Sequence, residues 1–128
     1  MSEAFNDLPG APKAVGPYSQ AVQSGHLLFL SGQLGLNPET GALIDGGVAA
    51  QAEQALKNIK SVLNARNLDL KNIVKATIFL TDMADFKAVN EVYSRVLGDA
   101  RPARSTIQVA ALPLGGIVEI EVVAEVMP

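Results

Sequence analysis

The sequence predicts an α+β fold in which one mixed β-sheet carries two helices on one face. Two segments have apolar residues at helical spacing, and several others show the short apolar runs or the alternation that are typical of strands. Their order along the chain is strands, helix, strand, helix and two strands. One sheet covered on one face by both helices is the economical way to bury these apolar surfaces. A chain of 128 residues has the size of one ordinary domain, so we expect a single domain over residues 1–128.

The first third of the chain is predicted to contain short strands and much irregular structure. Residues 1–16 are rich in proline, glycine and alanine, and we expect an irregular N-terminal arm. Residues 18–23 are predicted as a short strand, and residues 24–25 as a turn. The compact apolar run 27–30 indicates a buried strand. Residues 31–47 carry several turn dipeptides and are predicted to be mostly loop, with at most a short hairpin.

The first helix is the clearest element of the sequence. Apolar side chains recur at helical spacing at Ala49, Ala52, Ala55, Leu56, Ile59, Val62 and Leu63. Polar residues occupy the opposite face, and residues 67–69 end the pattern. This segment is therefore predicted to be an amphipathic helix that packs on the sheet.

A strand and a second helix follow. Residues 73–80 alternate and are predicted to form the strand. One face would hold Val74, Ala76, Ile78 and Leu80, and the other Lys75, Thr77 and Phe79. Thr81 or Asp82 is suited to be the N-cap of the next helix, and Gly98 ends that helix. The buried stripe of the second helix is predicted to be Phe86, Val89, Tyr93, Val96 and Leu97.

Residues 103–109 and 118–126 are predicted to be the two final strands. Alternate positions from Val118 to Val126 are apolar, which indicates that they face the core. The sheet face directed away from the helices is predicted to carry Lys75, Phe79, Arg104, Thr106, Glu119 and Val123. That mixed face is either solvated or an interface between subunits.

The composition argues against several function classes. Ten Lys and Arg against thirteen Asp and Glu give a net charge of −3, and the basic residues are scattered, which argues against a nucleic-acid protein. The chain has no cysteine, so a thiol nucleophile, a disulfide scaffold and a thiolate metal site are excluded. Its one histidine, His26, is predicted to be a turn residue rather than a catalytic base or metal ligand.

The chain is expected to be cytoplasmic and oligomeric. No apolar run approaches the roughly 18–20 residues of a membrane-spanning helix, and the polar, acidic residues 1–7 do not resemble a signal peptide. A hydrophobic content of 48% is high for a soluble chain with few aromatic residues. Because large exposed apolar patches are rare on soluble monomers, we expect a homo-oligomer.

Four polar residues stand out by their positions in the predicted elements. Arg104 lies in a strand pattern, where it is either a bidentate ligand for a carboxylate or the cross-strand ion-pair partner of Glu119 or Glu121. Glu119 is either solvated or binds and activates a water molecule. Asn90 lies along the buried stripe of the second helix, where it either bonds the backbone or lines a site. Tyr18 is either a packing residue or a hydroxyl at a pocket rim.

These residues belong to four segments that resemble the motifs of the reactive intermediate deaminase family, formerly grouped with translation inhibitors and perchloric-acid-soluble proteins. The segments are residues 16–21, residues 31–35 with Pro38 and 40–41, residues 85–93, and residues 101–106 with 117–120. They occur in order, and the resemblance extends over nearly the whole chain, from residue 16 to residue 125. One departure is Thr106, where some members have cysteine.

The resemblance implies a chorismate-mutase-like fold and a homotrimer with a barrel-like core and active sites between subunits. It implies hydrolysis of reactive 2-imino acids and enamines, such as 2-iminopropanoate and 2-iminobutanoate, to 2-keto acids and ammonia, without a metal or a cofactor. Arg104 would bind the substrate carboxylate, and Glu119 would position or activate water. The other substrate-binding residues would be Tyr18, Ser31, Gly32, Asn90 and Thr106.

Two other function classes stay open. The chain is alternatively a trimeric binding module that holds small carboxylate metabolites, or apolar segments of other proteins, without turnover. A ribonuclease or translation inhibitor is less favoured, because the acidic balance and the single histidine suit neither RNA binding nor RNA cleavage.

Overall fold

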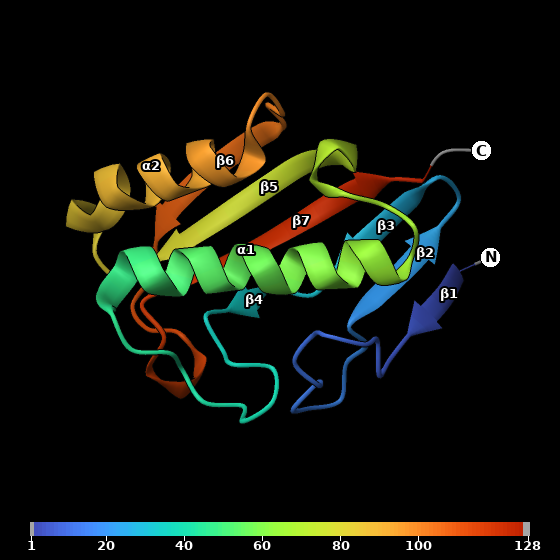
Figure 1. The fold of residues 1–128 in the computed structure, drawn as a ribbon, viewed down its shortest axis with the longest axis horizontal. Helices are drawn as coiled ribbons and strands as arrows, with labels where there is room; N and C mark the ends of the chain where they lie inside the picture. The colour runs from blue at the N-terminus through green and yellow to red at the C-terminus, as the bar shows by residue number, and fades with distance from the viewer. Residues whose placement is uncertain (1, 127–128) are drawn as a thin grey trace.

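In a computed structural model that describes residues 2–126, the chain forms one mixed β-sheet with two α-helices on one face (Figure 1). The helices are α1 (Gly47–Ala65) and α2 (Phe86–Leu97). The strands are β1 (Ser2–Phe5), β2 (Ala21–Ser24), β3 (Leu27–Leu30), β4 (Gln33–Leu34), β5 (Ile73–Leu80), β6 (Ala103–Gln108) and β7 (Val118–Glu125). The short 3-10 helices η1 (Leu70–Asn72), η2 (Met83–Asp85) and η3 (Pro113–Gly115) lie in the connections. The predicted single mixed sheet with two helices is confirmed.

The strand order is β1-β2-β3-β7-β5-β6, and β4 also pairs with β7. Neighbouring strands are antiparallel except β5 and β6, which are parallel. A parallel pair needs a crossover connection, and α2 supplies it. The edge strand β6 therefore follows α2, and α1 and α2 pack beside each other on the same face of the sheet (Figure 1).

The core lies between the two helices and the sheet. The predicted face of α1 is buried from Ala52 to Leu63, whereas Ala49 in its first turn is exposed. A bulge in β5 between Ile73 and Lys75 turns Ile73 inward and leaves Val74 40% exposed, so the prediction that Val74 is buried was wrong. The buried core positions of the sheet include Leu28, Leu30, Ala76, Ile78, Leu80, Val118, Ile120, Val122 and Ala124.

The second helix begins after a capped turn, as predicted. The carboxylate of Asp82 accepts a hydrogen bond from the backbone N–H of Ala84 at 2.9 Å and starts η2, which leads directly into α2. The buried stripe differs from the prediction at three positions: Val92 is buried, Val96 is only partly buried, and Phe86 at the start of α2 is 37% exposed. Gly98 ends the helix with a positive φ of 61°. Phe86 is therefore available at the surface beside β6.

The N-terminal segment is more ordered than predicted. Residues 2–5 form β1, which pairs antiparallel with β2 from Ser2 opposite Ser24 to Phe5 opposite Ala21. The prediction of an irregular arm over residues 1–16 was therefore wrong for residues 2–5, and residue 1 lies outside the described residues. β2 starts at Ala21, later than predicted, because the backbone turns at Tyr18, whose N–H donates to the carbonyl of Gly16 at 2.8 Å.

The pairing of β6 places Arg104 on the other face of the sheet from the one predicted. β6 pairs with β5 and not with β7, and its register places Arg104 beside Ala76 and Thr106 beside Ile78. Ala76 and Ile78 are buried beneath the helices, so Arg104 and Thr106 lie on the helix side of the sheet. The prediction that they share the outer face with Glu119 was wrong, because it took the alternate residues Ala103, Ser105 and Ile107 as the side facing the core, whereas these three residues are exposed.

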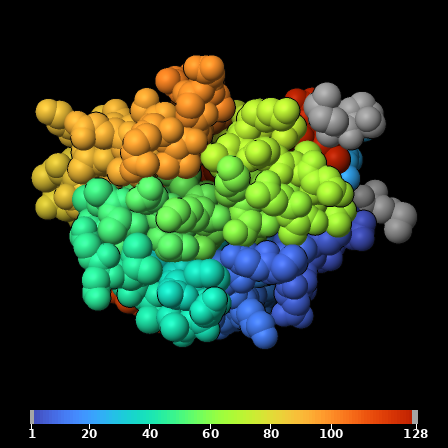
Figure 2. All heavy atoms as spheres, in the orientation of Figure 1, coloured from blue at the N-terminus to red at the C-terminus, as the bar shows by residue number. Residues whose placement is uncertain are grey.

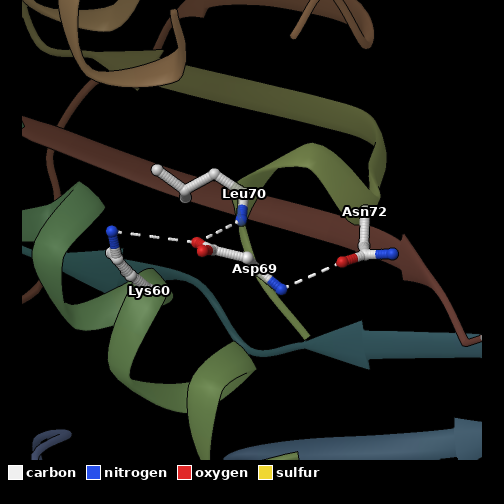
Figure 3. A network of polar contacts seen from close by, with 4 residues as sticks. All are labelled: Lys60, Asp69, Leu70 and Asn72. Carbon is white, nitrogen blue, oxygen red and sulfur yellow. Dashed lines mark hydrogen bonds and ion pairs between the residues drawn. The ribbon is translucent and has the colours of Figure 1, made fainter. Parts of the chain in front are cut away.

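A small polar network fixes the connection from α1 to β5 (Figure 3). The carboxylate of Asp69 accepts from the N–H of Leu70 at 2.7 Å, and its own N–H donates to the side-chain oxygen of Asn72 at 2.9 Å. Lys60 on α1 approaches the same carboxylate at 3.8 Å. These contacts start η1 and direct the chain into β5.

Two buried side-chain amides fix the loop after β4 and the N-terminal arm in place. Asn58 on α1 donates to the carbonyls of Leu34 and Leu36, at 3.2 and 2.9 Å. Gln20 donates to the carbonyl of Pro12 at 2.6 Å and thereby attaches the N-terminal arm. The space-filling view shows this arm beside the loop that follows β4, below α1 (Figure 2). Buried amides with partners are stabilising and fix position, so both loops have defined places.

Candidate active site

Two pockets contain most of the predicted site residues. The first, which we call the Arg104 pocket, lies where α2 meets the start of β6. It has a volume of about 310 Å³. Its lining residues are Asn90, Tyr93, Ser94, Arg101, Pro102 and Arg104. The guanidinium carbon of Arg104 is 4.9 Å from the centre of the Tyr93 ring and 5.8 Å from that of Phe86. These are distances for cation–π attraction, so the two aromatic rings restrain the guanidinium.

Arg104 has no acidic partner within residues 2–126. The ion pairs there join Lys60 to Asp69 and Arg95 to Glu53. The alternative of a cross-strand ion pair between Arg104 and the acidic residues of β7 is therefore wrong, because β5 separates β6 from β7. A guanidinium without a carboxylate partner, facing a pocket, is suited to bind a carboxylate in bidentate fashion.

Tyr93 also lines this pocket, a role that the sequence did not indicate. It was predicted as a core residue, and it is buried, but its hydroxyl has no hydrogen-bond partner within the described residues. Burial raises the pKa of Tyr93, and the nearby charges of Arg104 and Arg101 act in the opposite direction. The hydroxyl therefore stays protonated and is available as a donor. The available signal was a hydroxyl in an otherwise apolar helical stripe.

Two predicted binding residues accompany Arg104. Asn90, one turn before Tyr93 on α2, is half-buried and lines the pocket. Thr106 lies two residues after Arg104 on the same side of β6, and its hydroxyl is buried without a partner within residues 2–126. A buried hydroxyl without a partner costs free energy, which a ligand or a water molecule would recover. The structure thus places Asn90 in the pocket and Thr106 next to Arg104.

The second pocket, which we call the Glu119 pocket, lies between the N-terminal arm and the end of the sheet. Its volume is about 150 Å³. It is lined by residues 12–15, Tyr18, Gln20, residues 32–34, Leu36, residues 113–114 and Glu119. Three of the predicted site residues, Tyr18, Gly32 and Glu119, thus line one pocket, whereas Asn90 lines the other.

Gly32 allows the Glu119 carboxylate to lie close to the backbone. A Cβ atom built on Gly32 would be 2.5 Å from Oε2 of Glu119, so any larger residue at position 32 would displace the carboxylate from its present place. Between β3 and β4 the register with β7 shifts by one residue, from Phe29 opposite Val123 to Gln33 opposite Ile120. This extra residue forms a bulge at which the Gly32 backbone bends towards the carboxylate.

Two further residues support the Glu119 pocket in different ways. Tyr18 is 48% exposed, and its hydroxyl accepts a hydrogen bond from the N–H of Val15 at 3.3 Å. Ser31 donates its hydroxyl to the carbonyl of Ser19 at 2.6 Å, so this hydroxyl is used to hold the chain before β2. Tyr18 reaches the pocket, whereas Ser31 positions the pocket wall.

The electrostatic environment of Glu119 makes it a stronger base than an ordinary glutamate. Burial raises the pKa of Glu119, and the negative charge of Glu121 on the same face of β7 raises it further. A carboxylate with a raised pKa binds a proton more readily, which is the property required of a general base that removes a proton from water.

The two pockets lie on different faces of the sheet in one subunit. Glu119 is opposite Phe79 in the register and faces away from the helices, whereas Arg104 is on the helix side. The pockets share no lining residue. A single chain therefore does not bring Arg104 and Glu119 together.

Residues 2–126 contain no cluster of three or more His, Cys, Asp or Glu side chains with the placement of metal ligands. None of the helices in this range has the length and apolar character that crossing a membrane requires. His26 is exposed at the turn between β2 and β3, as predicted, and lines neither pocket.

The fold defines a small α+β protein in which one mixed sheet is covered on one face by two helices, with one pocket at Arg104 and another at Glu119. Residues 9–126 match the family model described as Endoribonuclease L-PSP, and the chain belongs to this family. The resemblance inferred from the sequence motifs is thereby confirmed.

Relatives with names and structures extend this comparison. The chain is 55% identical to Protein DfrA of Myxococcus xanthus, over 89% of this chain and 88% of that protein. It is 52% identical to the 2-iminobutanoate/2-iminopropanoate deaminase of Mus musculus, over 89% of this chain and 84% of that protein. The crystal structure of E. coli TdcF with bound serine superposes with a TM-score of 0.91 at 38% identity, covering 98% of this chain and 100% of that one.

Proposed function

We propose that this protein is an enzyme that hydrolyses reactive 2-imino acids and their enamine tautomers, including 2-iminopropanoate and 2-iminobutanoate, to 2-keto acids and ammonia. The observation that carries the proposal is the Arg104 guanidinium, which has no acidic partner within residues 2–126 and opens onto a pocket. Relatives about half identical over most of the chain, named for this deaminase activity, support the same reaction.

Arg104 is the proposed carboxylate ligand of this site. Its guanidinium donates two parallel hydrogen bonds to the carboxylate of the imino acid, while the rings of Tyr93 and Phe86 hold it in place. Asn90 and Thr106 offer further polar groups around the same anion. Fixing the carboxylate orients the imine carbon for attack, which lowers the entropic part of the barrier.

Glu119 is the proposed base for the attacking water. The carboxylate accepts a proton from water as the water oxygen bonds to the imine carbon, and it returns this proton to the imine nitrogen to give a tetrahedral carbinolamine. The carbinolamine hydroxyl then passes its proton through the same carboxylate to the amino group, the carbon–nitrogen bond breaks as the C=O bond forms, and ammonia and the 2-keto acid are released. The imine is already an activated electrophile, so positioning and general-base assistance suffice, and neither a metal nor a cofactor is proposed.

The site is proposed to form between the subunits of a homotrimer with a chorismate-mutase-like fold and a barrel-like core. The Arg104 pocket of one subunit would meet the Glu119 pocket of the next, which is how residues on opposite sheet faces can serve one substrate. The outer sheet face offers apolar side chains for such an interface. Large apolar residues exposed on this face include Leu27, Phe29 and Ile107, whose exposed fractions are 38%, 44% and 45%. Burying them would relieve an unfavourable contact with water.

Three further expectations belong to the proposal: a single domain, a cytoplasmic location and a small-molecule partner. One contiguous core cluster runs from Ala11 to Ala124, which supports a single domain over residues 1–128. A chain without cysteine suits a reducing compartment, which supports a cytoplasmic location. Acidic net charge and scattered basic residues support a small-molecule partner rather than a nucleic acid.

The proposed activity is tested by generating the imine in place. An amino-acid oxidase acting on alanine, with catalase present, forms 2-iminopropanoate, and semicarbazide captures the remaining imine as a semicarbazone that absorbs in the ultraviolet. We expect the protein to lower the rate of semicarbazone formation in proportion to its concentration. A rate that does not change at any protein concentration would refute the deaminase function.

Binding without turnover is the second candidate, and the bound serine in the TdcF structure favours it as an alternative. A binding module would take up a 2-keto acid or an amino acid in a calorimetric titration and would leave the semicarbazone rate unchanged. The combination of tight binding and no acceleration would therefore select this candidate.

Tyr93 provides a further prediction, as a residue that positions Arg104. Tyr93→Leu removes the ring that faces the guanidinium, at a cost of about 1 kcal/mol or roughly fivefold in kcat/KM, and the loss should appear mainly in KM because carboxylate binding weakens. Tyr93→Phe keeps the ring and should restore KM. Steady-state kinetics of both variants, with melting temperatures as a control for folding, check this. Equal KM values for the leucine and phenylalanine variants would contradict the role of the ring.

A further inference from the structure

Leu114 has a backbone conformation that large side chains rarely adopt. It lies in η3, the turn between β6 and β7, with φ 59° and ψ 18°, and its side chain is 60% exposed. The left-handed region suits glycine, and a bulky residue there is an outlier. Such outliers are found preferentially at ligand sites, where the surrounding structure maintains them.

The surroundings of the turn explain how this conformation is held. Pro113 has a fixed φ at the start of the turn, and the N–H of Gly116 donates to its carbonyl at 3.0 Å. Leu34 packs so closely against Gly116 that a Cβ there would lie 2.8 Å from Cδ2 of Leu34. The turn is therefore anchored at both ends, and Leu114 between them projects outward.

Leu114 projects beside the Glu119 pocket and makes part of its wall apolar. Val15, Leu34 and Leu36 line the same pocket, and Glu119 lies in it with Gly32. The volume of about 150 Å³ matches that of engineered apolar cavities that take up benzene. This is more space than the methyl group of 2-iminopropanoate or the ethyl group of 2-iminobutanoate fills.

We propose that Leu114 determines specificity by forming the apolar wall that receives the side chain of the 2-imino acid. The inference rests on the proposed function: the carboxylate is bound at Arg104, the imine carbon lies at Glu119, and the side chain extends between Leu114 and Val15. The preferred substrates are then imino acids with larger apolar side chains, such as the imine formed from leucine. Burial of the additional carbon atoms against this wall supplies the preference.

The proposal is tested with two variants that differ in the backbone but share the loss of the side chain. Leu114→Ala removes the wall and keeps a residue that is strained at positive φ, whereas Leu114→Gly removes the wall and the strain together. The measured quantity is kcat/KM for the imine from leucine divided by that for the imine from alanine. We expect this ratio to fall about tenfold in both variants, as for the loss of contacts to a few carbon atoms in an apolar pocket.

Stability and assembly separate this role from a structural one. Leu114→Gly should melt no lower than Leu114→Ala, and both should keep the oligomeric state of the unchanged protein in sedimentation. Val74→Ala, at an exposed apolar residue outside both pockets, is the control and should leave the ratio unchanged.

Three results would overturn the inference. An unchanged ratio in the glycine variant would show that Leu114 does not contact the substrate side chain. Dissociation of the oligomer would show that Leu114 is an interface residue instead. A ratio that falls equally in the Val74 control would show that the effect is not local. The hydrolysis of the alanine-derived imine by the unchanged protein is measured in the same experiment, so failure of the proposed function is recognised separately.

Discussion

Replacing Arg104 with alanine is expected to abolish imine hydrolysis while leaving the fold intact. The guanidinium is the only cation that the structure places between the rings of Tyr93 and Phe86, within residues 2–126. Two hydrogen bonds between charged groups contribute about 1.5–3 kcal/mol each, so their loss corresponds to about 10²–10⁴-fold in kcat/KM. The measurement is the semicarbazone competition assay over a range of imine concentrations.

Arg104→Lys and Arg95→Ala are the matched controls for this experiment. Lysine keeps the charge and loses the bidentate geometry, so we expect intermediate activity. Arg95 lies on α2 and pairs with Glu53 outside the Arg104 pocket, so its replacement should leave kcat/KM unchanged. Wild-type rates in Arg104→Ala would remove Arg104 from the mechanism, and equal losses in Arg95→Ala would point to a general effect on α2.

The elements with strong internal periodicity were predictable from the sequence. α1 repeats apolar residues over several turns, and β5 alternates from Ala76 to Leu80, so each pattern determines its own element and most of its buried face. The bulge in β5 was not visible, because Ile73 and Val74 are both β-branched and either suits the core. β1 was missed because its four residues, Ser-Glu-Ala-Phe, carry no alternation and depend on pairing with β2.

The sequence did not predict which face of β6 the helices cover, because this depends on tertiary pairing. β6 is an edge strand whose two faces are both partly polar, so alternation alone does not say which side is covered. Adjacent strands in the sequence most often pair, which favoured a hairpin with β7. The structure instead places β5 between them, which rules out the hairpin, and the register of β6 against β5 puts Arg104 beside the buried Ala76, on the helix side of the sheet.

The local pattern singled out some of the candidate site residues, but their roles came only from the motif resemblance. Tyr18, Gly32 and Glu119 are far apart in the sequence and come together only because the β3–β4 bulge and the N-terminal arm meet at the end of β7. Tyr93 was assigned to the core because its helical spacing is that of a buried residue, and its buried hydroxyl is visible only in three dimensions. Periodicity reports burial, whereas the chemistry of a buried polar group depends on its neighbours.

Mixing two inactive variants is expected to restore activity, because the proposed site takes Arg104 from one subunit and Glu119 from another. Glu119→Gln removes the proposed base and should lower kcat by about 10²–10⁴-fold. When Arg104→Ala and Glu119→Gln chains are unfolded and refolded together in equal amounts, random assortment gives about a quarter of the sites with both original residues. A site contained within one chain would gain nothing, since no chain in the mixture carries both groups.

The matched control combines two variants from the same pocket. Arg104 and Asn90 both line the Arg104 pocket. A mixture of Arg104→Ala and Asn90→Ala chains therefore contains no intact Arg104 pocket, and the activity of the mixture should not exceed the mean activity of the two separate proteins. Recovery in the first mixture but not in the second would require the opposite sheet faces of two subunits to meet at one substrate. Equal behaviour of both mixtures, with mixed oligomers verified by mass spectrometry, would contradict the shared site and require Arg104 to act without Glu119.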